Sequence, residues 1–397
     1  MSGFSPEKLA RIPAFLQARI AAGDLPGAQI QIWRRGQLAH HSLMGLMDIE
    51  QVRPMREDTI YRIYSMTKPI TSVAALMLLE QGKLALDDAV AKYISGFAGL
   101  KLPDGTVVGQ TMTVRDLMRH TAGFTYSLHN NNAIDAQYRA LRLTEMDNPG
   151  GLPAMIAGLQ SLPLEYAPGT QWVYSVASDV LGYLVQTVSR VSLADFLREN
   201  ILTPLKMFDT DFMVPRAKAD RFAACYQQTQ GRLEVFSAYP NAKYFDPPLL
   251  ESGGGGLAGT ASDYLRFARM LLNGGALDGV RLLEPETVAQ MTQNQLPGGG
   301  DITSLSPAGS AFTESGYSGI GFGLGVSVTL DPAKVGIPGT VGEFGWGGMA
   351  STLFFVDPLE DMAVVFMTQV ITDTPRRVML RRQLRSLIYD AMTDKHA

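Results

Sequence analysis

Stretches at both ends of the chain carry the apolar patterns that are typical of β-strands. Near the N-terminus, "GAQIQIW" alternates from Ala28 to Ile32, turns at Arg35-Gly36 and resumes at Leu38, which predicts a hairpin. Near the C-terminus, three apolar runs predict further strands: "GFGLGVSVTL", "STLFFVDP" and "MAVVFMTQV". We therefore expect a sheet that is assembled from both ends of the chain.

Helical spacing of apolar residues dominates the region between these strands. The helices expected there cover residues 73–84, 114–118, 152–162, 178–197 and 261–272. Further helices are expected at the N-terminus and, rich in basic residues, over 375–392. We predict a discontinuous α/β domain made of residues 1–84 and 285–397, and a mainly helical domain of residues 85–284 inserted between its two parts.

The composition is that of an ordinary globular protein. Of its 397 residues, 46% are hydrophobic, so the chain can bury a large core. The 34 basic and 38 acidic residues are interspersed and give a formal charge of -4, which argues against nucleic acid as a partner. The most apolar helix is too short to span a bilayer, and no secretory signal is visible. The single cysteine, Cys225, permits no intrachain disulfide. A cytoplasmic protein without a membrane partner is expected.

A serine and a lysine stand three residues apart where an extended segment gives way to an apolar helix, in "YRIYSMTKPITSVAALMLL". On a helix this spacing places Ser65 and Lys68 on one face, so the amine could serve the hydroxyl as a base. Pro69 suits a first helical turn, which puts Ser65 where free N–H groups favour an oxyanion. The alternative is that Ser65 caps the helix and Lys68 points to water. Ser5 and Lys8 share the spacing, but no strand precedes them and no site is expected there.

A tyrosine is the candidate for a third group. In "APGTQWVYSVASDVLGYLV", a Pro-Gly turn leads to Tyr174, which lies on a connection before a helix that begins near Ser178. Connections of this kind carry chemistry more often than core positions do. The alternative is a core tyrosine whose hydroxyl is satisfied by a neighbour. A second candidate, Tyr239 in "YPN", lies in a Pro-rich loop and is not preferred.

Five short motifs follow one another along the chain. They are "SMTK" at 65–68, "LMRHTAGF" at 117–124, "PGTQWVYS" at 168–175, "GGGGLAGTASDYLRFARMLL" at 253–272 and "GWGG" at 345–348. In this order they resemble the serine β-lactamase and penicillin-binding-protein superfamily, above all the family VIII carboxylesterases, bacterial esterases that share the class C β-lactamase fold. The resemblance covers nearly the whole chain. It implies a β-lactamase/transpeptidase-like fold, with an antiparallel sheet flanked by helices and a largely helical second domain.

The resemblance also implies the roles of the site residues. Ser65 would be the nucleophile of an acyl-enzyme mechanism, Lys68 its partner and Tyr174 the third catalytic group. Two residues depart from the β-lactamase pattern: Val176 stands in place of an asparagine, and Trp346 in place of the lysine of Lys-Thr-Gly. Trp346 cannot bind a carboxylate as an ammonium would. We therefore expect hydrolysis of small, uncharged, short-chain esters.

Acyl transfer requires a base and an oxyanion site. The ordinary pKa values of lysine and tyrosine, about 10.4 and about 10, are too high for a base at pH 7, although burial lowers the first and a neighbouring ammonium lowers the second. The sequence leaves open whether Lys68 or Tyr174 is the base. We expect the backbone N–H groups of Ser65 and Met349 to bind the oxyanion. The residues expected to bind substrate are Trp346, Gly347, Gly348, Phe124, Tyr126 and Tyr244.

Other signals argue against a cofactor. Gly254, Gly256 and Gly259 fit G-x-G-x-x-G, but no predicted strand precedes them, so no dinucleotide is expected. The five histidines include no H-E-x-x-H motif, and no metal is expected. A β-lactamase, an acyltransferase or a D-amino-acid peptidase with the same site is the alternative function, and a non-catalytic penicillin-binding sensor is a more distant one. The oligomeric state and the physiological ester stay open.

Overall fold

The two ends of the chain meet in one sheet, as the apolar patterns predicted. The structure, a computed structural model, describes residues 3–129, 132–307 and 317–395. The large sheet in these residues has the strand order β10-β11-β12-β13-β14-β1-β2-β3, and every neighbouring pair is antiparallel. Its strands are β1 (Gly27–Arg34), β2 (Gln37–Asp48), β3 (Arg53–Pro54), β10 (Ile320–Phe322), β11 (Ser327–Thr329), β12 (Phe344–Gly347), β13 (Leu353–Asp357) and β14 (Met362–Met367).

Strand β1 joins the N-terminal hairpin to the C-terminal strands because it pairs with both β2 and β14. The predicted hairpin turns at Arg35 and Gly36, whose φ angles of 50° and 76° suit a two-residue turn that matches the strand twist. Every residue of β14 is buried. Alternate side chains of β14 enter cores on opposite faces of the sheet, which explains why its sequence is a continuous apolar run.

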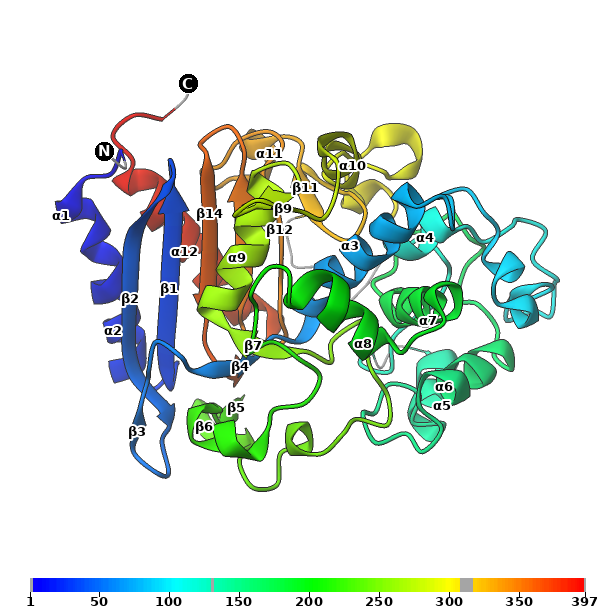
Figure 1. The fold of residues 1–397 in the computed structure, drawn as a ribbon, viewed down its shortest axis with the longest axis horizontal. Coiled ribbons are helices and arrows are strands. Elements are labelled where there is room, and N and C mark those ends of the chain that lie inside the picture. Colours follow the sequence, from blue (N-terminus) through cyan, green and yellow to red (C-terminus); the bar gives the residue numbers. More distant parts are fainter. Residues whose placement is uncertain (1–2, 130–131, 308–316, 396–397) are drawn as a thin grey trace.

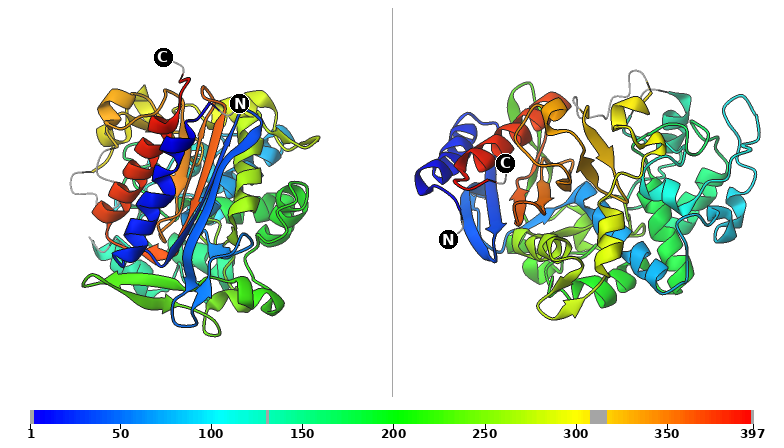
Figure 2. Two further views of the ribbon diagram at one scale, coloured as in Figure 1. Left: turned by 90° about the vertical axis from the view of Figure 1, so that its left-hand side faces the viewer. Right: turned by 90° about the horizontal axis from the view of Figure 1, so that it is seen from above.

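Helices cover both faces of this sheet. On one side, here called the outer face, α2 and α12 lie next to each other, one from each end of the chain (Figure 2). Ile12 and Leu16 of α2 and Leu384 and Ile388 of α12 share a buried core with Ile30 of β1. On the opposite, inner face, α9 packs against β1, β13 and β14 (Figure 1). The predicted antiparallel sheet flanked by helices is thus confirmed. These helices are α1 (Pro6–Leu9), α2 (Arg11–Ala21), α9 (Ala261–Leu272) and α12 (Thr374–Ala391).

A mainly helical region lies beside the sheet (Figure 1). Its helices are α3 (Thr67–Glu80), α4 (Val114–Met118), α5 (Ala133–Ala140), α6 (Gly151–Gln160), α7 (Ala177–Ser189) and α8 (Leu193–Leu197). One helix was expected over 178–197, but Arg190 adopts a left-handed φ of 67° and ends α7, and the Ser192 side chain caps α8. The predicted domain limits remain a prediction. Helix α9, which they assign to the helical domain, packs on the sheet.

Two short strands bring distant segments together below the sheet. β4 (Ile60–Arg62) pairs antiparallel with β7 (Ala258–Thr260), so the segment that leads to Ser65 lies beside the glycine-rich segment 253–256. The remaining strands and helices are β5 (Cys225–Thr229), β6 (Arg232–Ser237), β8 (Ala276–Leu277), β9 (Val280–Arg281), β15 (Val370–Ile371), α10 (Pro285–Met291) and α11 (Pro332–Val335). The β4–β7 pairing sets the position of the candidate active site.

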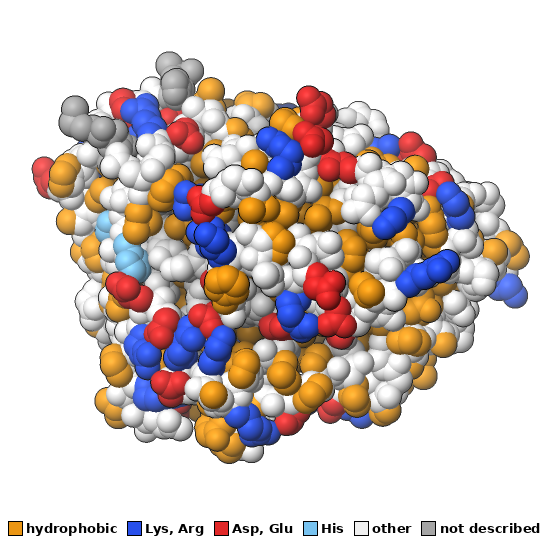
Figure 3. Space-filling model, viewed as in Figure 1, with side chains coloured by type: hydrophobic (Ala, Val, Ile, Leu, Met, Phe, Trp, Pro, Cys, Tyr) orange, Lys and Arg blue, Asp and Glu red, His pale blue; other side chains and the backbone are white. Residues whose placement is uncertain are grey.

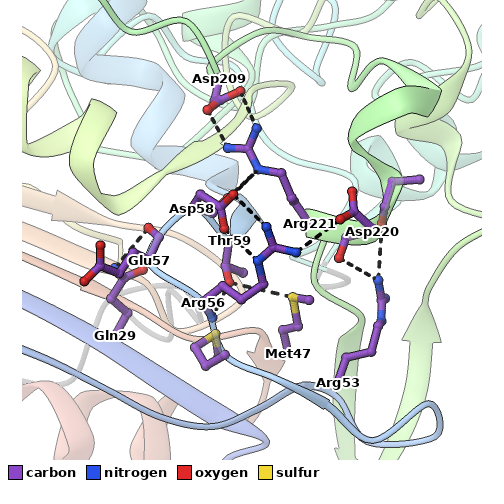
Figure 4. A network of polar contacts seen from close by, with 12 residues as sticks. Gln29, Met47, Arg53, Arg56, Glu57, Asp58, Thr59, Asp209, Asp220 and Arg221 are labelled. Carbon is purple, nitrogen blue, oxygen red and sulfur yellow. Dashed lines mark hydrogen bonds and ion pairs between the residues drawn. The ribbon is translucent and has the colours of Figure 1, made fainter.

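A network of ion pairs anchors the chain just before β4 (Figure 4). Arg56 contacts Asp58 at 2.9 Å and Asp220 at 3.1 Å. Arg221 contacts Asp58 at 3.0 Å and also pairs with Asp209. Exposed ion pairs contribute little singly, but linked pairs hold segments in register. This network ties the start of β4 to the segment that precedes β5.

The surface is mixed in charge. On the face seen in Figure 3, acidic and basic side chains are interspersed among apolar and neutral ones. This face therefore carries no large field of one sign. Among the helices of the described ranges, none combines the length and the apolar character that a bilayer crossing requires.

Candidate active site

Ser65 lies in a tight turn between β4 and α3. Residues Tyr64–Met66 form a single 3-10 turn, and Tyr64 adopts a left-handed φ of 45°. A non-glycine residue in this conformation is uncommon, and such residues cluster at functional sites. The residue before α3 is Met66, and its side chain makes no cap hydrogen bond. The alternative in which Ser65 caps the helix is therefore wrong.

Lys68 is fully buried in the first turn of α3, with an exposed fraction of 0%. Its Nζ donates a hydrogen bond to the carbonyl oxygen of Gly254 at 2.7 Å and a longer one to Ser65 Oγ at 3.4 Å. Catalytic hydrogen bonds are often long in proteins without substrate. The alternative in which Lys68 points to water is wrong, and the amine faces the Ser65 hydroxyl.

The glycine-rich segment lies against α7, which places the Gly254 carbonyl beside Lys68. Asp179 of α7 accepts hydrogen bonds from the Gly254 N–H at 3.0 Å and from the Ser252 hydroxyl. A Cβ on Gly254 would stand 2.4 Å from Asp179 Oδ2, so only glycine allows this approach. Burial raises the pKa of the Asp179 carboxyl, and the charge of Lys68 opposes that shift. The sequence reasoning missed Asp179, whose one signal was an aspartate in the first turn of a predicted helix.

The aromatic rings of Tyr174 and Tyr126 lie beside Lys68. The Nζ of Lys68 is 4.5 Å from the centroid of the Tyr174 ring and 5.3 Å from that of Tyr126. The two rings stack with centroids 5.8 Å apart. On the other side, Trp346 Nε1 donates a hydrogen bond to the Tyr174 hydroxyl at 3.3 Å. These contacts bring Lys68, Tyr174, Tyr126 and Trp346 together, although they are distant in the sequence.

Two histidines, to which the sequence reasoning gave no role at the site, contact Tyr174. The His120 ring lies 4.8 Å from the Tyr174 ring, centroid to centroid. His129 Nε2 donates to the backbone carbonyl of Tyr174 at 2.7 Å. Burial lowers the pKa of His120 well below its ordinary value, and the nearby Lys68 adds to this effect. His120 is therefore neutral at pH 7 and packs as an uncharged ring against Tyr174.

A cavity opens at Ser65. Its lining consists of Ser65, Tyr174, Tyr317, Trp346, Gly347, Gly348, Met349, Arg377 and Arg381. Lys68 and Tyr126 lie behind this lining, against Tyr174. Phe124 and Tyr244, which were also expected to bind substrate, lie elsewhere among the described residues. Phe124 packs on Phe97, and Tyr244 packs on Phe222 in a separate cluster. The sequence offered these two residues only as aromatic side chains suited to line a pocket, and residue type does not specify the long-range packing.

Two arginines of α12, Arg377 and Arg381, line the cavity. The expectation that the cavity lacks a cation for a substrate carboxylate was therefore wrong. The sequence showed a basic helix over 375–392, but did not indicate that this helix passes the end of β12. There the chain carries Gly347, whose missing side chain leaves room for the guanidinium of Arg381 from the outer face. Both arginines are less than 10% exposed, at 6% and 8%. The cavity therefore has positive charge, although Trp346 replaces the lysine of the β-lactamase pattern.

The glycines after Trp346 bring β12 against the turn that holds Ser65. A Cβ on Gly348 would stand 2.5 Å from the carbonyl oxygen of Ile63. The chain then turns back, with the Ser351 N–H donating to the Gly348 carbonyl at 3.2 Å. Met349 is the second residue of this turn, so the turn's own hydrogen bond leaves its N–H unused. Ser65 and Met349 both line the cavity, which is the arrangement that two oxyanion donors require.

The described residues contain no cluster of three or more histidine, cysteine or acidic side chains that could hold a metal. Chemistry at this site would rest on the hydroxyl of Ser65, the amine of Lys68, the phenol of Tyr174 and backbone N–H groups. A buried amine beside a hydroxyl that lines a cavity is suited to nucleophilic acyl transfer.

Comparisons with known proteins agree with this geometry. The family described as Beta-lactamase matches residues 12–387. Esterase EstB from Burkholderia gladioli is 31% identical over 384 residues, which cover 90% of this chain and 90% of that protein. Protein Rv1367c from Mycobacterium tuberculosis is 35% identical over 364 residues, which cover 89% of this chain and 88% of that protein.

Solved structures show the same fold. EstCE1, described as a hydrolase with promiscuous acyltransferase activity, has a TM-score of 0.82 at 27% identity and covers 96% of this chain and 99% of its own. The β-lactamase/transpeptidase-like fold and the resemblance to family VIII carboxylesterases are confirmed. Because the family matches nearly the whole length of this chain, the chain belongs to the Beta-lactamase family.

Proposed function

We propose that this protein is a serine carboxylesterase that hydrolyses short-chain esters through an acyl-enzyme on Ser65. The observation that carries the proposal is the buried amine of Lys68, 3.4 Å from Ser65 Oγ and enclosed by the rings of Tyr174 and Tyr126. Lys68 is buried and faces a hydroxyl that lines a cavity. A lysine in such a place is more typical of catalysis than of a solvent-exposed surface. EstB and EstCE1, an esterase and a hydrolase, support the ester as substrate class.

In acylation, Ser65 Oγ attacks the ester carbonyl carbon while its proton passes to the Lys68 and Tyr174 pair. The negative charge on the carbonyl oxygen is stabilised by the N–H groups of Ser65 and Met349. The bond to the alcohol oxygen then breaks, and the alcohol leaves with the proton. In deacylation, water takes the place of the alcohol: it gives a proton to the same pair, attacks the acyl carbon and releases the acid, and Ser65 regains its proton.

The second candidate function is acyl transfer to an alcohol instead of water. EstCE1, which shares the fold across almost the whole chain, is described as a hydrolase with promiscuous acyltransferase activity. The same acyl-enzyme serves both reactions, so the acceptor decides the outcome. The ratio of alcoholysis to hydrolysis, measured with a primary alcohol added to the ester assay, separates the two functions.

The test is a comparison of p-nitrophenyl esters with acyl chains of two to twelve carbons, with nitrocefin alongside and the Ser65→Ala variant as control. We expect the highest kcat/KM at about two to six carbons, and no hydrolysis by Ser65→Ala beyond background. Equal or better turnover of nitrocefin would replace the esterase by a β-lactamase. A burst of p-nitrophenol without turnover would indicate a penicillin-binding sensor. The expected cytoplasmic location and the absence of nucleic-acid and membrane partners stay predictions.

A further inference from the structure

Arg381 reaches from α12 to the end of β12 at the candidate active site. Its Nη2 donates hydrogen bonds to the carbonyl oxygens of Gly348 at 2.9 Å and of Thr352 at 2.8 Å. The residue is only 8% exposed, although it carries a full charge. Burying a guanidinium is costly unless it makes strong, directed contacts. These two hydrogen bonds hold Nη2 at the end of β12.

Gly347 makes this position possible. A Cβ on Gly347 would stand 2.3 Å from Nη2 and 2.4 Å from Cζ of Arg381. The guanidinium thus occupies the space in which any other residue would carry its side chain. From the sequence, Gly347 and Gly348 were expected to bind substrate. In the structure, Gly348 permits the close approach of the turn before Ser65, and Gly347 leaves space for the guanidinium of Arg381.

The two carbonyls close the turn that contains Met349. The Gly348 N–H donates to the Thr352 carbonyl at 3.0 Å, and the Gly348 carbonyl accepts from the Ser351 N–H at 3.2 Å. Arg381 adds a charged donor to both of these carbonyl oxygens. Removal of the guanidinium would remove its two hydrogen bonds to the turn. The turn would then be held less firmly, and the direction of the Met349 N–H would be less well fixed.

The Gly348 carbonyl and the Met349 N–H belong to the same peptide group. A cationic donor on the carbonyl oxygen polarises that peptide, and hydrogen bonds in such a chain strengthen one another. The N–H of Met349 thereby becomes a stronger donor to the developing oxyanion. Arg381 acts here through the peptide, by its hydrogen bond to the Gly348 carbonyl.

We propose that Arg381 is a positioning residue that orients and polarises the Gly348–Met349 peptide as the second oxyanion donor. The proposal rests on the proposed function, since it requires an oxyanion at Met349. A donor that acts on the transition state changes kcat and leaves substrate binding nearly unchanged. A guanidinium that instead held the substrate would change KM.

The experiment compares Arg381→Met and Arg381→Lys with Arg382→Gln. Arg382 is the matched control because it follows on the same helix and donates to the Gly336 carbonyl at 3.2 Å, away from the turn. With p-nitrophenyl butyrate, we expect kcat to fall by about 10- to 100-fold in Arg381→Met, with KM within about 3-fold of the wild type, and a smaller loss in Arg381→Lys. Arg382→Gln should retain wild-type kinetics.

Two further measurements separate positioning from folding. An aryl trifluoromethyl ketone forms a tetrahedral adduct with the serine, so its affinity should fall in parallel with kcat/KM. Titration with a serine-reactive phosphonate counts competent sites, so that kcat is expressed per site. Gly347→Ala, which keeps the arginine but displaces it, should reproduce the loss in kcat if Arg381→Met fails to fold.

Three results would overturn the proposal: a raised KM at unchanged kcat, an unchanged kcat per titrated site with a lowered Tm, or unaltered affinity for the ketone. Failure of the esterase assignment itself would be seen separately, as hydrolysis that survives in Ser65→Ala.

Discussion

The Nζ of Lys68 lies 4.5 Å from the centroid of the Tyr174 ring, inside the protein. The same nitrogen is the one that faces Ser65 Oγ at 3.4 Å. An ammonium against the face of an aromatic ring is an attractive contact, and burial strengthens it. The two side chains therefore form one unit, and a change in either alters the environment of the other.

This pairing predicts how the two residues contribute to rate. Lys68→Ala and Tyr174→Phe should each lower kcat/KM for p-nitrophenyl butyrate by about 100-fold or more, because both belong to one proton-transfer unit. The double variant should lose much less than the product of the single losses. Steady-state kinetics of the four proteins in a double-mutant cycle tests this. Multiplicative losses would mean that one residue serves substrate binding alone.

Substrate preference should follow the residues that replace the β-lactamase pattern. Trp346 and Val176 supply neither the ammonium nor the amide that would hold a β-lactam carboxylate, and one charge-assisted hydrogen bond is worth about 1.5 to 3 kcal/mol. We predict that kcat/KM for p-nitrophenyl butyrate exceeds that for nitrocefin by about 100-fold or more. Arg377 lines the cavity and replaces part of the missing charge, so Arg377→Gln should widen this gap by lowering the rate with nitrocefin more than the rate with the uncharged ester. Equal losses on both substrates would contradict a role for this charge in binding carboxylates.

The glycine-rich segment offers a matched pair of substitutions. A Cβ on Gly254 would stand 2.4 Å from Asp179 Oδ2, whereas the nearest atom to a Cβ on Gly255 is at 3.8 Å. Gly254→Ala should therefore displace the carbonyl that binds Lys68 and lower both Tm and kcat, while Gly255→Ala should change neither strongly. Thermal unfolding and ester hydrolysis measure the two effects. Equal behaviour of the two variants would argue against the close approach to Asp179.

A buried carboxyl on the outer face of the sheet should make stability depend on pH. Glu343 contacts Arg385 and accepts a hydrogen bond from the Tyr389 hydroxyl. Burial raises the pKa of Glu343 to about 7, and the charge of Arg385 opposes this rise. Between the pKa of an unfolded glutamate, about 4.3, and about 7, the folded protein therefore holds a proton that the unfolded chain has lost.

The sign follows from this difference in bound protons. Since the folded state binds more protons in that interval, the free energy of unfolding decreases as the pH rises from about 5 to about 7. Glu343→Gln cannot titrate, so its Tm should fall less over the same interval. Differential scanning calorimetry of both proteins at several pH values provides the test. Parallel curves for the variant and the wild type would show that Glu343 is not the group responsible.

Patterns of neighbouring residues predicted the features that depend on contacts between residues close in the sequence. The alternation around Ile30 and Ile32 gave the hairpin, and the three-residue spacing of Ser65 and Lys68 gave the pair that the structure brings together. The helix break at Arg190 was missed because a left-handed arginine has no compositional signal.

Contacts between distant segments could not be predicted in this way. Asp179 meets Gly254 only because α7 packs under the glycine-rich segment, and Arg381 meets Gly348 only because α12 crosses the sheet. Tyr244 illustrates the opposite error. Its aromatic side chain suggested a place in the cavity, but packing against Phe222 places it in a separate cluster. Sequence spacing defines a shared helix face, and tertiary packing decides the rest.

The most direct measurement of the central claim is the site of covalent labelling. A serine-reactive aryl phosphonate should add one mass increment to the intact protein, and peptide mapping should locate it on Ser65, with loss of ester hydrolysis in proportion to labelling. Ser65→Ala should take up no label and lose about 10⁴-fold or more in kcat/KM, whereas Ser5→Ala, which has the same spacing to a lysine, should behave as the wild type. Label on another serine, or near-normal hydrolysis by Ser65→Ala, would contradict the assignment of Ser65 as the nucleophile.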